Sequence, residues 1–81
     1  MNINVLFFGA CREALNTSEL ALALNAPANV ASAFATLRHQ FPLLENFGNS
    51  LLFAVNEVHS RADDPIHDGD TLAIFPPVSG G

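Results

Sequence analysis

The clearest element in the chain is encoded by the stretch NVASAFATLRHQFP, residues 29–42. Its apolar side chains recur at intervals of three and four and share one stripe of a helix. They are Val30, Ala33, Phe34, Leu37 and Phe41. Asn29 precedes the stripe and is a favoured N-cap residue. Pro42 ends the pattern, because proline disfavours helical geometry in the residue before it. The stretch therefore predicts one amphipathic helix.

Segments with strand patterns flank this helix. Alternation of apolar residues and short buried-looking runs predict strands at residues 2–8, 18–24, 51–55, 58–59 and 71–75, of which 58–59 is a very short edge strand. A short helical turn is expected over 10–15, closed by Asn16, and another turn over 43–47. Asp63-Asp64-Pro65 and His67-Asp68-Gly69-Asp70 are predicted turns, because such residues bond to their own backbone or tolerate positive φ.

This order of elements predicts an α+β fold. A hairpin, one crossing helix and a final strand that returns to the centre fit the β-grasp (ubiquitin-like) roll, a mixed sheet of about five strands with one main helix packed across it. In that fold the first and last strands lie side by side and parallel. We expect residues 1–75 to form the β-grasp domain and residues 76–81 an extended, flexible C-terminal tail that ends in Gly-Gly.

The charge balance bears on the partners. Eight acidic residues face three arginines, lysine is absent, and the formal net charge is −5. This charge repels phosphate backbones, so no nucleic-acid binding is expected. A basic protein partner suits the chain better, because complementary charge speeds encounter. The absence of lysine also excludes Schiff-base chemistry and a P-loop.

Cysteine usage and hydropathy bear on the compartment. The one cysteine allows no internal disulfide, which fits a reducing compartment. The N-terminal residues lack the basic and apolar regions of a signal peptide. The longest apolar runs fall well short of the roughly 20 residues that a membrane helix needs. We therefore expect a cytoplasmic protein that does not enter a membrane.

The last seven residues, FPPVSGG, carry the strongest functional signal. Pro76 and Pro77 end the last strand, because proline donates no ladder hydrogen bond, and they hold the exit extended. Gly80 and Gly81 leave a thread without side chains that can enter a narrow channel. A terminal carboxylate presented in this way can be activated as an acyl adenylate, and sulfide attack would then leave a thiocarboxylate.

These residues resemble a known family. Residues 5–8 (VLFF), Arg12-Glu13, Val55-Asn56, Asp68-Gly69-Asp70 and the FPPVSGG end together resemble the small, sulfur-carrier subunits of molybdopterin synthase. The resemblance spans the whole chain. A terminal Gly-Gly is common to ubiquitin-like carriers, whereas the double proline at this distance from the Asp-Gly-Asp turn is far more specific.

The resemblance implies a cycle. An adenylating protein similar to ubiquitin-activating enzyme uses ATP to adenylate Gly81, and a sulfur-transfer step leaves a covalent 1-thioglycine there. The loaded chain then docks on the large subunit of molybdopterin synthase, in a heterotetramer of two each, and sulfur passes to cyclic pyranopterin monophosphate. The chain itself is expected to bind no cofactor and to be no enzyme on its own.

The sequence also predicts where partners bind. Phe8 and Phe75 are expected opposite the core-directed Phe7 and Ile74, as one exposed apolar patch beside the tail, with Arg12 close by. Partner contacts are further expected along the tail at Pro76, Pro77, Val78 and Ser79. The alternative for Phe8 or Phe75 is packing under a local loop.

Other reactive side chains are weaker candidates. His39, His59 and His67 lack metal-ligand spacing, and the two carboxylates of Asp68-Gly69-Asp70 suit a turn better than a metal loop. His59 would make docking pH-sensitive if it lies at the interface. Cys11 is better interpreted as a small hydrophobic residue than as a sulfur relay.

Three other functions stay open at this point. The chain is alternatively a ubiquitin-like modifier joined through Gly81 to other proteins, a sulfur carrier for thiamine or cysteine synthesis, or an interaction domain with an inert tail. Independent catalysis is disfavoured, since no nucleophile and base stand at a recognisable spacing.

Overall fold

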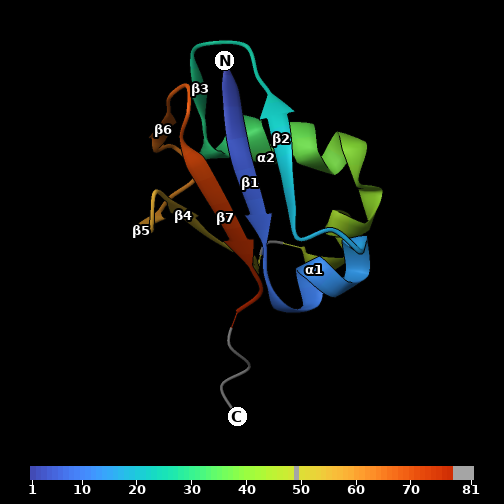
Figure 1. Ribbon diagram of the computed structural model, residues 1–81. Coiled ribbons are helices and arrows are strands. Elements are labelled where there is room, and N and C mark those ends of the chain that lie inside the picture. The colour runs from blue at the N-terminus through green and yellow to red at the C-terminus, as the bar shows by residue number, and fades with distance from the viewer. Residues whose placement is uncertain (49, 78–81) are drawn as a thin grey trace.

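The computed structural model describes residues 1–48 and 50–77. Its main sheet has five strands in the order β2-β1-β7-β4-β5, and α2 lies behind it in Figure 1. The strands are β1 (Asn2–Phe7), β2 (Glu19–Ala23), β4 (Leu52–Val55), β5 (Val58–Ser60) and β7 (Thr71–Phe75). The helices are α1 (Gly9–Leu15), α2 (Val30–Gln40) and the 3₁₀ helix η1 (Pro42–Phe47). This is the expected β-grasp arrangement.

The predicted helix forms for the predicted reasons. The Asn29 side chain accepts a hydrogen bond from the Ser32 backbone N–H at 2.8 Å, and the Ser32 hydroxyl accepts one from the Asn29 N–H at 2.9 Å. This reciprocal capping box satisfies two otherwise free donors at the start of α2. The helix ends before Pro42, which begins η1. The turn predicted over residues 43–47 is thereby confirmed.

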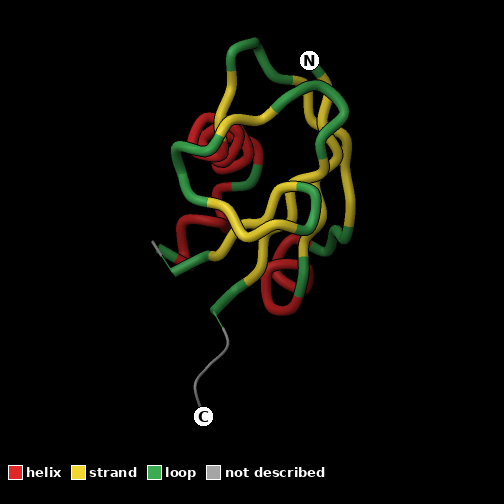
Figure 2. The backbone as a smooth tube through the Cα atoms, turned by 90° about the vertical axis from the view of Figure 1, so that its left-hand side faces the viewer, coloured by secondary structure: helices red, strands yellow, loops and turns green. Residues whose placement is uncertain are grey.

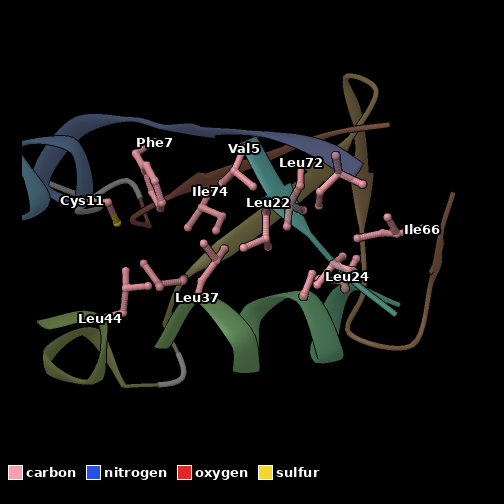
Figure 3. Packing of buried hydrophobic residues seen from close by; sticks show 14 residues of the cluster. Val5, Phe7, Cys11, Leu22, Leu24, Leu37, Leu44, Ile66, Leu72 and Ile74 are labelled. Carbon is pink, nitrogen blue, oxygen red and sulfur yellow. The ribbon is translucent and has the colours of Figure 1, made fainter. Parts of the chain in front are cut away.

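The core lies between the sheet and α2. Val30, Ala33 and Leu37 of the helix are buried against alternate residues of the central strands. Figure 3 shows Leu37 pointing from α2 toward Ile74 and Leu22. The most deeply buried strand residues on this face, each at most 3% exposed, are Ile3, Val5, Phe7, Leu22, Leu72 and Ile74. Phe34 and Phe41 of the predicted stripe are only half-buried, at its edges.

The pairing of the first and last strands decides where the chain leaves the sheet. β1 and β7 are parallel, with Val5 opposite Leu72 and Phe7 opposite Ile74. Both strands therefore run toward the same end, and the start of β1 lies at the other end (Figure 1). Figure 2 shows the chain leaving beside the short helix α1. The expectation of adjacent, parallel first and last strands is confirmed.

A second, two-stranded sheet was not predicted. β3 (Ala28–Asn29) pairs antiparallel with β6 (Pro65–Ile66), so Pro65, expected in a turn, is the first residue of a strand. The pairing secures the loop before β7 to the start of α2. Asp63 and Asp64 keep the expected turn or bend geometry.

The start of β7 is held by Asp70 and Asn56. The Asp70 carboxylate accepts hydrogen bonds from the His67 backbone N–H at 2.8 Å and the Asn56 side-chain amide at 2.9 Å. Asn56 in turn accepts from the Thr71 N–H at 2.9 Å. Asp68 accepts from the Asn2 N–H at 2.7 Å. The Asp-Gly-Asp segment thus connects the β4–β5 turn, β1 and β7, which supports its interpretation as a structural turn.

These bonds give the fold an acid sensitivity. The pKa of Asp70 is lowered, first by the His67 N–H and then by the Asn56 amide. A carboxyl whose pKa is lower in the folded state stabilises the fold above its unfolded pKa, and this stabilisation is lost as pH falls. Asp70→Asn is expected to lower stability at neutral pH and to flatten the fall below about pH 4, measured by urea unfolding. Asp63→Asn, which removes the same charge from an exposed loop, is the control. An equal acid slope in wild type and Asp70→Asn would contradict the assignment.

Among the described residues, no helix is long and apolar enough to cross a membrane.

Candidate docking surface and tail exit

The exit of the chain is packed against the start of α1. The ladder between β1 and β7 extends one step beyond β1, because the Phe8 N–H donates to the Ile74 carbonyl at 3.0 Å. At Gly9, where φ is +55°, an added Cβ would lie 3.3 Å from Pro76 Cγ. Pro76 is half-buried and Pro77 is exposed. Pro76 therefore leaves the sheet along a defined path, with α1 beside it.

Part of the predicted site lies outside the described residues. Val78, Ser79, Gly80 and Gly81, which the sequence assigns to the reactive tail, belong to that part of the chain. Their roles stay predictions.

The face of the sheet opposite α2 carries a row of residues that crosses all five strands. Strand register places Leu6 opposite Ala73, Ala73 opposite Ala54, and Ala54 opposite His59. Glu19 lies opposite Leu6 at the other edge. Residues directly opposite on paired strands project to the same face. The row is thus apolar at its centre, with a carboxylate at one end and an imidazole at the other.

A second row lies closer to the tail exit. Leu52 is paired with Phe75, and Phe8 lies one step beyond the pair of Phe7 and Ile74, beside Phe75. We call the six apolar residues of the two rows the open face: Leu6, Phe8, Leu52, Ala54, Ala73 and Phe75. Phe8 is exposed, Ala54 is buried among its neighbours, and the other four are half-buried. An apolar sheet face that the helix does not cover, placed beside an exit of the chain, is the kind of surface that associates with a partner.

The predicted patch is present, with one refinement. Phe8 is 45% exposed and is among the most exposed large hydrophobic side chains in the described residues. Phe75 projects to the same side, opposite the buried Phe7 and Ile74, but its side chain is half-buried, whereas an exposed side chain was expected. Leu52 is its partner on the neighbouring strand β4. Arg12 is exposed on α1, one helical turn beyond Phe8.

Three residues of the open face, Leu52, Ala54 and Ala73, were not expected there, and Leu6, although expected on the face of Phe8, was not assigned to the patch. Leu52 and Ala54 belong to a run that looks buried on both sides, and Leu6 and Ala73 alternate with core residues. Only the register between strands brings them together. A hollow of about 320 Å³, lined by Leu6, Asn56, Glu57 and Thr71, lies beside this face on the side away from the exit. It offers a concave place for a partner side chain.

The two other candidate side chains, His59 and Cys11, differ in their exposure. His59 is exposed at the edge strand β5 and lies at the end of the first row. Cys11 is fully buried in the core, and burial raises the pKa of its thiol. A raised pKa keeps the thiol protonated and unreactive, which favours the interpretation of Cys11 as a core residue.

Metal chemistry finds no support in the part of the chain that the structure describes. Its histidine, cysteine, aspartate and glutamate residues form no group of three or more that could hold an ion. Asp68 and Asp70 use their carboxylates to accept hydrogen bonds from backbone N–H groups.

The sheet order, the crossing helix and the parallel central pair define a ubiquitin-like β-grasp protein. The crystal structure of SAMP1, small archaeal modifier protein 1, from Haloferax volcanii superposes with a TM-score of 0.89 at 26% identity, covering 100% of both chains.

Sequence comparison identifies the family. The model of the ThiS family matches residues 5–81, and the chain belongs to this family. Two curated relatives are named molybdopterin synthase sulfur carrier subunit. The one from Escherichia coli is 38% identical, with 98% of this chain and 99% of the relative covered. The one from Chlamydomonas reinhardtii is 34% identical, with 100% of each covered.

Proposed function

We propose that this chain is the sulfur-carrier subunit of a molybdopterin synthase and acts in molybdenum cofactor biosynthesis in the cytoplasm. The observation that supports this most is the parallel pairing of β1 with β7. It directs Pro76 and Pro77 out of the sheet, beside the open face, which α2 does not cover. The names of the full-length relatives point to the same role.

The proposed chemistry takes place at the Gly81 carboxylate. One of its oxygens attacks the α-phosphorus of ATP, the bond to the β-phosphate breaks, and pyrophosphate leaves. Hydrosulfide then attacks the carbonyl carbon of the acyl adenylate, the bond from this carbon to the phosphate oxygen breaks, AMP leaves, a proton passes to solvent, and a thiocarboxylate remains. In the synthase, this sulfur passes to cyclic pyranopterin monophosphate. Gly80 keeps the thread narrow enough to enter a partner's site.

The partners supply the catalytic groups in this proposal. The adenylating protein binds ATP, and the large subunit of the synthase, two copies with two of this chain, supplies the pterin pocket. Both need access to the same tail. The proposed docking site consists of residues that are adjacent in the chain or in space: the open face, Arg12 and residues 76–79. The two partners therefore dock there in turn rather than together. The net charge of −5 suits partners with basic contact surfaces.

Intact mass spectrometry tests the loading step directly. Wild-type protein incubated with ATP, the adenylating partner and a sulfur source is expected to gain the mass that corresponds to replacement of one oxygen by sulfur. Fragmentation should place the change at Gly81. The same mixture without ATP is the control. An unchanged mass with an active partner would rule out the carrier role.

A second function has a specific observation in its favour, the likeness to SAMP1, a protein named as a modifier. As a modifier, the chain would be joined through Gly81 to amino groups of other proteins. Stable conjugates in cell extracts that disappear when Gly81 is deleted would support this function. A sulfur carrier of thiamine or cysteine synthesis is another alternative. Transfer of the sulfur to those precursors and not to the pterin would identify it.

A further inference from the structure

The chain has few amines and thiols of its own that an activated Gly81 could acylate. If the proposed function holds, the chain carries an acyl adenylate, which transfers its acyl group to amines and thiols. The 81 residues contain no lysine. The groups of these two kinds that remain are the α-amine of Met1 and the thiol of Cys11. Both belong to the described part of the chain, so their accessibility can be assessed.

The Cys11 thiol is close to the exit but withdrawn from it. Cys11 lies on α1, whose first residue, Gly9, approaches Pro76. Its side chain is nevertheless 0% exposed, and Figure 3 shows the sulfur in the interior near Phe7 and Leu44. Burial also raises the pKa of the thiol. Because the thiolate is the nucleophile, access and ionisation both oppose its acylation.

The Met1 amine lies at the end of the sheet opposite the tail exit (Figure 1). It donates a hydrogen bond to the Leu24 carbonyl at 2.8 Å and is partly buried there. From Met1 to Phe8, beside the exit, the strand extends over about 23 Å. The six residues after Phe75, fully extended, span at most about 21 Å. A tail folded straight back along the sheet would therefore need its full extended length to approach its own amine, and in either copy that amine is partly buried in its hydrogen bond to Leu24.

The positive charges are carried by groups that do not accept acyl groups. Arg12, Arg38 and Arg61 are all exposed. A guanidinium stays protonated at physiological pH, whereas a lysine amine loses its proton readily enough to act as a nucleophile. The chain thus keeps cations for partner contacts without offering an acceptor to an activated carboxyl group.

We infer that this chain is a one-way donor: its folded surface presents no amine or thiol that an activated Gly81, of the same copy or another, can acylate. The reaction that this prevents is attack of an amine nitrogen on the carbonyl carbon of the adenylate. An amide bond would form, the bond from the carbonyl carbon to the phosphate oxygen would break, AMP would leave, and the amine proton would pass to solvent. The activated Gly81 therefore remains available to react with the sulfur donor and with acceptor groups on partner proteins.

The test introduces acceptors at exposed positions away from the open face. Arg61→Lys keeps the charge and adds an amine, Arg61→Gln is its matched control without one, and His39→Lys adds an amine on α2. Each protein is incubated with ATP and the adenylating partner without a sulfur source, and products are separated on reducing gels and weighed intact. We expect no amide-linked carrier dimer from wild type or Arg61→Gln, and a dimer of two chains less one water from both lysine variants.

Free lysine added to the wild-type protein distinguishes failure of the proposed function, activation of Gly81, from failure of the one-way inference. If the carboxyl group is activated, free lysine is expected to form an amide at Gly81. No amide in any sample, together with no release of pyrophosphate, would refute the proposed function. An amide with free lysine combined with wild-type dimers, or with lysine variants that stay monomeric, would overturn the one-way inference alone. Peptide mapping of a wild-type dimer would show whether Met1 or Cys11 had reacted.

Discussion

A chain extended by one glycine after Gly81 is expected to lose sulfur loading almost completely. The added residue moves the carboxylate by about 3.5 Å, whereas a misplacement of about 1 Å at a reacting centre can already cost about 100-fold in rate. The loss should therefore reach at least about 100-fold in adenylation rate, followed as pyrophosphate release and as sulfur gain by intact mass. Folding should be unaffected, because the addition lies beyond the core and beyond the last strand, β7.

A matched variant separates the effect of tail length from the effect of a side chain at the last residue. Gly81→Ala keeps the position of the carboxylate and adds one methyl group, so it tests whether the partner's channel requires a thread without side chains. The glycine extension keeps the thread thin and changes only its length. Normal loading of the extended chain would show that the adenylating site accepts a displaced terminus and would contradict this prediction.

Most of the fold was predictable because its strongest signals are local. The helical stripe, the Asn29 cap and the Pro42 stop all act within one element, and each is present in the structure. The α1 turn likewise ends at Asn16, in the left-handed conformation that asparagine tolerates. The β3–β6 pairing escaped prediction, because a strand of two residues has no periodicity to detect.

The candidate site was predictable only where large apolar side chains alternate with core residues along a strand. Phe8 and Phe75 are large apolar residues at positions that alternate with core residues, so their common face followed from the expected parallel pairing. Ala54 and Ala73 are too small to mark a surface in the sequence. Their place in the row depends on a register set by hydrogen bonds between strands far apart in the chain. The sequence therefore predicted the common face of Phe8 and Phe75 and missed the small residues beside them on the neighbouring strands.

The double variant Phe8→Ala, Phe75→Ala is expected to weaken binding of the large subunit by about 30-fold to 1,000-fold. Aromatic anchors at the centre of an interface typically cost more than about 1 kcal/mol each when truncated, and about 2–4 kcal/mol together corresponds to that range. Both side chains belong to the row nearest the exit, where a partner that engages the tail must also contact the sheet. Isothermal titration calorimetry with the purified large subunit measures the effect.

The control for lost apolar surface is Leu43→Ala. Leu43 is 50% exposed, close to the 45% of Phe8, but it belongs to η1, the helix that follows α2 on the covered side of the sheet. This variant should bind like wild type. Phe75 is half-buried beside Leu52, so thermal unfolding of the double variant must show that the fold is retained, and Phe75→Leu supplies a version that keeps apolar contact. Affinity unchanged in a folded double variant would remove the open face from the docking site, and a loss in Leu43→Ala as large as that in the double variant would place docking elsewhere.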